Sequence, residues 1–195
     1  MRRLFGTLLA ASAATALFAL PVRAADPSKL IETVTTEVVE IVTTKTGADR
    51  QAAMRQVVQD NFDVPYMGRS ALGTHWNQAS EQQQARFLAA VETSAARDYS
   101  ERFGKSAEYT VTIGRVISRP NRVWIVDSRF NQSGGQPIKI EWEVHDSDQG
   151  LRIADVKVEG VRMSMTMRSD FNSYIQSNFG EVESLVKELE ARAAR

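Results

Sequence analysis

Two histidines are the first residues to consider as acid–base catalysts, because histidine has an ordinary pKa near neutrality. His75 and His145 stand in unrelated sequence contexts, and His145 falls on the charged side of an alternating segment, which favours a solvated surface histidine. The chain has no cysteine, which excludes thiol nucleophiles, zinc–thiolate sites and covalent haem attachment. Serine-hydrolase, zinc-protease and phosphate-loop motifs are also absent from the sequence. The sequence therefore indicates no catalytic centre and no cofactor.

Two weaker alternatives for chemistry involve aspartates. Asp146 and Asp148 are calcium ligands by type, but they fall in a predicted hairpin turn, where aspartate is common for backbone reasons. They also supply too few ligands for that ion. Tyr99 or Tyr109 with Asp155 is the pairing to check for a small enzyme, although nothing in the sequence brings these residues together. We therefore expect binding without catalysis.

The N-terminus has the three regions of a secretory signal peptide in order. Two arginines give a basic start, residues 4–20 carry no charge, and small residues precede a cut after Ala24. The apolar stretch is short for a membrane span, and an uncleaved anchor helix is the alternative. We expect residues 1–24 to be a signal peptide and residues 25–195 to form one domain outside the cytoplasm.

The remaining 171 residues are enough for a single domain with a core. Loss of three arginines from 24 basic residues leaves 21 against 24 acidic ones, a net charge of about −3. This balance argues against a nucleic-acid partner. One basic cluster remains, which is either a solvated face or a surface attracted to anionic head groups or an acidic partner. It consists of Lys105, Arg115, Arg119, Arg122 and Arg129.

The N-terminal half has the spacing of helices. Apolar residues between 30 and 42 recur at helical intervals, although many β-branched residues in this segment favour a strand locally. A second helix is predicted from Asp49 to Asp60. A capping-box pattern beginning at Ser80 opens the clearest helix of the chain, from Glu81 to about Phe103.

From Tyr109 the period of the apolar residues changes to two. Four such segments, joined by short turns, predict an antiparallel meander. The third is the clearest, because Ile140, Trp142 and Val144 alternate with charged residues and predict one apolar and one charged face. In the last segment the apolar phase slips between Ile153 and Val156, which predicts a bulge or a strong twist.

The segment after Gly160 begins with alternating methionines and becomes helical from Met167 onward. Gly180 ends that helix, and residues 181–195 form a final amphipathic helix. Helices therefore flank the strands on both sides along the chain. We expect an α+β fold in which a four-stranded antiparallel curved sheet is wrapped by N- and C-terminal helices that cover its apolar face.

Two segments resemble the periplasmic MlaC proteins, the toluene-tolerance family. One runs Phe-Asp-Val-Pro-Tyr-Met over residues 62–67, with Leu-Gly and a tryptophan shortly after it. The other combines Asp-Val-Lys-Val-Glu-Gly-Val at 155–161 with Met-Arg-Ser-Asp-Phe at 167–171. The resemblance covers nearly all of the mature chain. Arg162 and Met163 depart from the smaller polar residue and aliphatic residue of many members, which affects the rim of the pocket. The hopanoid-associated HpnM branch is an alternative.

The resemblance implies a non-enzymatic carrier that holds phospholipid acyl chains in an apolar pocket. It implies shuttling between an outer-membrane lipoprotein complex and an inner-membrane ABC transporter with an MCE-domain protein. The alternatives are a carrier of hopanoid or another polycyclic lipid, a small periplasmic enzyme of a cone-shaped α+β fold, and an adaptor whose sheet face is filled by helices. The candidate lining combines the apolar strand face with helix residues: Phe62, Met67, Leu72, Phe87, Val91, Tyr99, Val111, Ile113, Trp124, Val126, Ile140, Trp142, Val144, Val156, Val158, Met163, Met167 and Phe171.

Overall fold

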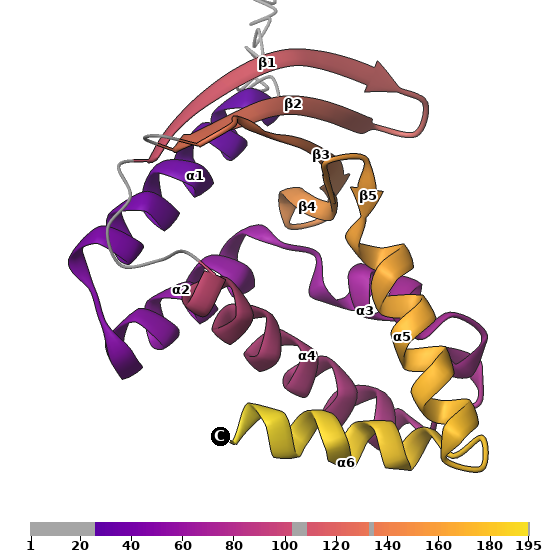
Figure 1. Ribbon diagram of the computed structural model, residues 1–195. Coiled ribbons are helices and arrows are strands. Elements are labelled where there is room, and N and C mark those ends of the chain that lie inside the picture. Colours follow the sequence, from indigo (N-terminus) through magenta and orange to yellow (C-terminus); the bar gives the residue numbers. More distant parts are fainter. Residues whose placement is uncertain (1–25, 103–108, 133–134, 195) are drawn as a thin grey trace, which may run out of the picture.

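The computed structural model describes residues 26–102, 109–132 and 135–194. The predicted signal peptide and Lys105 lie outside these described residues. Within them, none of the helices has the length and apolar character needed to cross a membrane. Helices, a sheet and two further helices follow one another along the chain (Figure 1), so the predicted α+β class and antiparallel sheet are confirmed.

The helical part before the sheet contains four α-helices and a short 3₁₀ helix. The predicted helices in this region are present, and the turn that follows α2 leads directly into a further helix of nine residues. The elements are α1 (Pro27–Thr44), α2 (Gly47–Asn61), α3 (Val64–Leu72), η1 (Gly73–Asn77) and α4 (Glu81–Arg102).

Helix α1 forms even though β-branched residues dominate its sequence. Asp26 caps its first turn by accepting a hydrogen bond from the Lys29 backbone N–H at 3.1 Å. The Thr35 hydroxyl donates to the carbonyl of Ile31 at 2.7 Å, so it is satisfied within the helix. The apolar stripe of the helix is buried. Burial of that stripe outweighs the local strand preference, because intrinsic propensities are small compared with the free energy of packing.

The sheet has five antiparallel strands in chain order, which is one more than predicted. The additional strand is only two residues long and pairs with the end of β4. Glu159 and Gly160 both have a positive φ, and this left-handed turn reverses the chain so that β5 lies beside β4. The strands are β1 (Tyr109–Arg119), β2 (Val123–Gln132), β3 (Ile138–Ser147), β4 (Gly150–Val158) and β5 (Val161–Arg162).

Two bulges interrupt the ladders and accompany the curvature visible in Figure 1. Between β3 and β4, residue pairing shifts so that Ala154 is the extra residue, which confirms the predicted phase slip. Between β1 and β2, Gly114 and Arg115 together face Asp127. A Cβ on Gly114 would lie 3.2 Å from the Cβ of Asp127, so glycine permits the close approach of the two strands there.

The helix after the sheet begins earlier than predicted. Helix α5 spans Met163–Ser177, so the helix predicted from Met167 is present but starts at Met163. The cause is a long-range contact: the carboxylate of Asp155, on β4, accepts the backbone N–H of Ser164 at 3.2 Å. This bond satisfies a free N–H group in the first turn, which stabilises the helix from that point. Helix α6 (Val182–Ala193) follows after a turn at Gly180.

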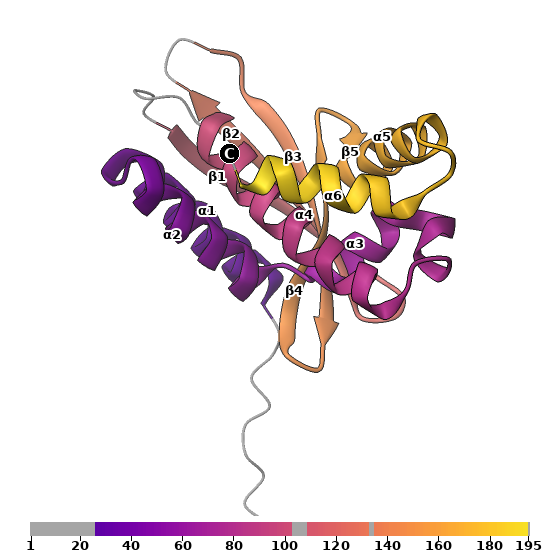
Figure 2. The same cartoon turned by 90° about the horizontal axis from the view of Figure 1, so that it is seen from below.

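The helices form a layer on one side of the sheet (Figures 1 and 2). Helix α1 contacts β1 and β2, α2 contacts α4, and α4 lies beside α6. Helix α3 contacts α5, which in turn contacts β4. The chain between α2 and α3 is fastened to the sheet because the Asp63 N–H donates to the Ile153 carbonyl at 2.8 Å. The helices are thus held to the sheet at several points around its apolar face.

An arginine joins α4 to α6. The Arg86 Nε donates to Glu190 Oε1 at 2.7 Å and its Nη2 to Glu190 Oε2 at 2.6 Å. Its Nη1 donates to Glu183 Oε1 at 2.9 Å. Such a two-pronged geometry is the most favourable arrangement of a guanidinium and a carboxylate. The ion pairs fix how α6 lies along α4.

We expect Arg86→Met to destabilise the protein at neutral pH but not in acid. Hydrogen bonds from Arg86 lower the pKa of Glu183 and Glu190 below the ordinary value of a glutamate. Stability from a depressed carboxyl pKa is present above the unfolded value and is lost as the pH falls through the folded value. The melting temperatures of the two proteins should therefore differ at pH 7 and converge as the pH falls below about 4. Arg55→Met, at an exposed position of α2, is the control. A difference that does not shrink as the pH falls from 7 into the acid range would contradict the assignment.

Candidate functional site

The inner face of the sheet is a continuous apolar surface built from alternate residues of four strands. Val126 on β2 pairs with Trp142 on β3, which pairs with Val156 on β4. Because side chains alternate between faces, residues two positions along each strand extend the same surface. Val126 and Val144 are completely buried on it. The predicted division of β3 into an apolar and a charged side agrees with this register.

Trp142 is the largest side chain on this face and has a polar partner there. Its indole Nε1 donates to the Ser128 hydroxyl at 2.8 Å, and both side chains are buried. Ser128 lies on β2, two residues from Val126, which is the residue that pairs with Trp142. The bond satisfies the only polar atom of the indole, so the ring can be held against apolar neighbours without an unpaired donor.

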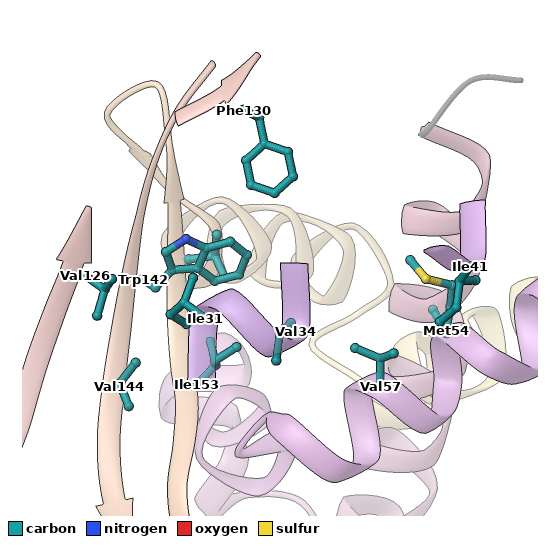
Figure 3. Packing of buried hydrophobic residues seen from close by; sticks show 12 residues of the cluster. Ile31, Val34, Ile41, Met54, Val57, Val126, Phe130, Trp142, Val144 and Ile153 are labelled. Atoms are coloured by element: carbon teal, nitrogen blue, oxygen red, sulfur yellow. The ribbon is translucent and has the colours of Figure 1, made fainter. Parts of the chain in front are cut away.

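Helices α1, α2 and α4 supply the opposite side of the same hydrophobic cluster. Figure 3 shows Phe130 and Trp142 projecting from the sheet to the side on which Val34 and Met54 lie. The side chains nearest the centre are buried, but several large ones on the sheet are only half-buried. The half-buried residues of this surface include Val111, Ile113, Trp124, Ile140 and Val158.

A second hydrophobic cluster joins α3, α4, α5 and α6. Phe87 is completely buried in it and meets Phe171 edge to face, with ring centroids 5.6 Å apart. Ile175 and Val186 are also completely buried. This cluster is a well-packed helical core, and it forms the side of the molecule away from the sheet.

A groove of about 420 Å³ lies between α4, α5 and α6. Its lining includes apolar residues from all three helices, such as Val91, Phe171 and Leu189. Charged side chains, Arg97, Asp170 and Arg192, also line it. Met163 lines the groove and also packs against the sheet cluster, so the groove reaches the edge of the apolar sheet face.

A buried carboxylate fixes the end of α5 against the sheet. Asp155 is 4% exposed and accepts hydrogen bonds from the Ser164 hydroxyl at 2.6 Å and from Arg162 Nη1 at 3.1 Å. Arg162 also donates to Glu143 at 2.8 Å. These hydrogen bonds to Glu143 and Asp155 raise the pKa of Arg162 despite its partial burial. The network ties β3, β4, β5 and α5 together beside the groove.

The residues considered for acid–base chemistry have structural partners. His75 is buried and lies within hydrogen-bonding distance of Gln78 and Asn172. His145 is half-buried rather than solvated, since its Nε2 lies 2.9 Å from Glu143 Oε1. Its ring also meets that of Tyr66 edge to face, at 4.7 Å between centroids. Burial and the nearby negative charge of Glu143 raise the pKa of Tyr66.

Two of the aspartates considered for chemistry, Asp155 and Asp146, likewise have partners. Asp155 binds Arg162 and Ser164, as described above, and Asp146 pairs with Arg122. The side chains of Tyr99 and Tyr109 lie outside the described part of the chain. No group of three or more metal-ligating side chains is present among the residues that the structure describes.

The predicted lining residues divide between the two clusters. Those in or against the sheet cluster are Phe62, Val111, Ile113, Trp124, Val126, Ile140, Trp142, Val144, Val156, Val158 and Met163. Those in the helical cluster are Leu72, Phe87, Val91 and Phe171. Met167 lines the groove, while Met67 is half-buried on α3 and is part of neither cluster as described. Contact of any of them with a ligand stays a prediction.

Several residues of the site had no clear signal in the sequence. The groove owes much of its lining to α6 and to small residues of α4 such as Ala95, whose positions only the packing of α4 against α6 defines. The partner of the Trp142 indole, Ser128, follows from strand register and not from spacing along the chain. The role of Asp155 as a helix cap could be suspected only from its conspicuous place on an apolar strand.

The family model described as MlaC protein matches residues 32–191. No sequence among curated proteins matches this chain. A phospholipid-binding protein from Ralstonia solanacearum, whose structure was determined in complex with a phospholipid, has a similar fold with a TM-score of 0.74. It is 23% identical in sequence, and the match covers 87% of this chain and 98% of that one.

We expect Asp155→Ala to lower the free energy of unfolding by about 2–4 kcal/mol, because it removes one partner from a buried ionic network. Urea denaturation followed by circular dichroism measures this change. Asp148→Ala, at an exposed position of the β3–β4 turn, is the matched control and should change stability by less than about 0.5 kcal/mol. Equal effects of the two substitutions would show that Asp155 does not hold α5 in place.

Proposed function

The chain belongs to the MlaC family, and from this premise we propose that it carries phospholipid through the periplasm. MlaC proteins are lipid-binding carriers, and the family is non-enzymatic. In the proposed complex, acyl chains lie between the apolar sheet face and the helices, and the polar head group faces water. The proposal includes removal of residues 1–24 after secretion and a single lipid-binding domain formed by residues 25–195.

The half-buried apolar side chains on the inner sheet face are the observation that carries the proposal. Ile113, Trp124 and Ile140 face the helices without being fully covered by them. A protein that used this face only for its own core would gain free energy by burying these residues completely. Their incomplete burial, with the groove that begins at Met163, is what a removable apolar ligand requires.

The energetics of lipid in water explain why such a carrier needs no catalytic group. Exposure of one CH₂ group to water costs about 0.8 kcal/mol. Two acyl chains of about 15 methylenes each would therefore cost about 24 kcal/mol, so free lipid does not cross an aqueous space at a useful rate. An apolar cavity shields the chains about as well as a bilayer does. Transfer is then nearly balanced in free energy, and its direction must come from partners.

The partners proposed for this chain follow from its family alone. They are an outer-membrane lipoprotein complex and an inner-membrane ABC transporter with an MCE-domain protein. The lipid itself is supported by the phospholipid-binding protein from Ralstonia solanacearum, which shares the fold over nearly its whole length. Phospholipid is therefore the first ligand to test, and a hopanoid or other polycyclic lipid is an outcome that the same test would reveal.

We expect protein purified from the periplasm without detergent to carry a lipid that native mass spectrometry detects. Filling the groove should reduce this load, so Ala95→Trp, within the groove lining, should lower bound lipid at least several-fold. Ala89→Trp, on the exposed side of the same helix, should leave it unchanged. The measurement compares bound mass and solvent-extracted lipid for the three proteins at equal thermal stability.

The outcomes separate the candidate functions. A bound mass equal to phospholipid supports the proposal and gives the number of acyl chains, whereas a polycyclic mass would assign a different cargo. A protein that is empty when purified and stays empty after incubation with liposomes would contradict lipid carriage. Full lipid load in a folded Ala95→Trp variant would place the ligand away from the groove.

A further inference from the structure

The outer face of the sheet carries the charged residues that alternate with its apolar side. Opposite charges meet across several strands on this face. Lys157 Nζ on β4 lies 3.0 Å from Glu141 Oε2 on β3, and Arg115 Nη2 on β1 lies 3.2 Å from Asp127 Oδ2 on β2. Such cross-strand ion pairs stabilise a sheet, whereas like charges directly opposite each other destabilise it.

Two acidic residues nevertheless lie directly opposite each other, and the fold compensates for them. Glu143 on β3 pairs in register with Asp155 on β4. Arg162 binds both carboxylates, with Nη1 at 2.8 Å from Glu143 and 3.1 Å from Asp155. Asp127 on β2 and Glu141 on β3 are also opposite each other, and each binds a basic residue of its own, Arg115 and Lys157. Where this sheet places two acidic residues together, it therefore supplies opposite charge to both.

Two basic residues also lie directly opposite each other, and among the residues that the structure describes no carboxylate binds both of them. Arg129 on β2 pairs in register with Lys139 on β3. Lys139 Nζ forms an ion pair with Glu141 Oε1, on the same strand, at 3.0 Å. The exposed side chain of Arg129 has no ion pair or hydrogen bond with any residue in the described ranges. The repulsion between Arg129 and Lys139 is thus left uncompensated within the part of the chain that the structure covers.

A hollow of about 380 Å³ lies at this same place. It is lined by the two basic residues and by Arg115, Thr112 and Gly114, where the bulge of β1 leaves the strand without a side chain. The acids nearby already have partners. Asp127, which also lines the hollow, binds Arg115, and Glu159 accepts the backbone N–H of Lys139. Ser128 is also part of the lining, but its hydroxyl accepts the Trp142 indole N–H on the inner face. Three cations and the Thr112 hydroxyl therefore border the hollow together with a single carboxylate.

We propose that this hollow binds a phosphate-type oxyanion. The guanidinium of Arg129 is its main ligand, because arginine presents a planar pair of donors that matches two phosphate oxygens. Lys139 and Arg115 add positive charge from either side. The anion takes the place between Arg129 and Lys139 that Arg162 takes between Glu143 and Asp155.

The site is separate from the proposed lipid cavity. Arg129 lies between Ser128 and Phe130 along β2, both of which are buried on the inner face, so it belongs to the opposite face of the sheet. Its ligand can be free phosphate or the phosphodiester of a lipid head group at a membrane surface, since both present the same oxygens. Evidence against lipid binding in the cavity would therefore not count against anion binding at this site.

Thermal unfolding at constant ionic strength tests the proposal with inorganic phosphate as the probe. We expect phosphate to raise the melting temperature of the wild-type protein in a saturable manner, with chloride as the reference. Arg129→Gln should abolish this shift, and Lys139→Gln should reduce it. Without phosphate, Arg129→Gln should raise the melting temperature by about 1–3 °C, because it relieves the like-charge pair.

Arg119→Gln is the matched control, since Arg119 is another exposed arginine of the sheet that does not line the hollow. It should keep the full phosphate shift.

Flotation with vesicles of phosphatidylglycerol or of phosphatidylcholine then distinguishes a lipid head group from free phosphate as the source of the anion. Binding to the anionic vesicles that is lost in Arg129→Gln identifies a head group, and a phosphate shift without vesicle binding identifies a small anion. No phosphate shift in the wild type, or equal loss in Arg119→Gln, would overturn the proposal.

Discussion

The separation of the sheet into an apolar and a charged face is the constraint on which the rest of the structure depends. Trp142 lies on a central strand, and burial of its large indole requires that this side of the sheet be covered. The only N–H of the indole is satisfied by the Ser128 hydroxyl. Buried apolar residues of α1, together with Met54 and Val57 of α2 and Ala96 of α4, face this side. The opposite side is left to ion pairs, which tolerate solvent at little cost or gain in free energy.

The helices cover the apolar face without collapsing onto all of it. Helix α1 packs on β1 and β2, while α5 is anchored at the far side by the carboxylate of Asp155. Helices α4 and α6 are joined by Arg86 into a unit with its own hydrophobic core. These contacts hold the helices in place through hydrogen bonds and separate hydrophobic clusters. The fold is therefore stable without close packing of the helical unit against the whole apolar face of the sheet. This arrangement leaves apolar residues half-buried in a folded protein.

Much of the fold could be predicted from periodicity, and the failures have identifiable causes. The helical and alternating segments of the sequence became helices and strands because each has one apolar side to bury. The helix predicted from Met167 begins at Met163 instead, because a carboxylate from strand β4 accepts a backbone N–H of its first turn. The two-residue strand β5 was missed because a turn at Gly160, not a pattern of side chains, creates it.

The sequence by itself determined the class of fold, the family resemblance and the two-faced character of the sheet, since these follow from residue types at local spacings. Tertiary structure alone decided which residues meet. The lining predicted as one set is divided between a sheet cluster and a helical cluster. The like-charged pairs Glu143–Asp155 and Arg129–Lys139 exist only through strand register. Local spacing specifies which side of an element a residue occupies, whereas register and helix packing, which join distant segments, specify its neighbours.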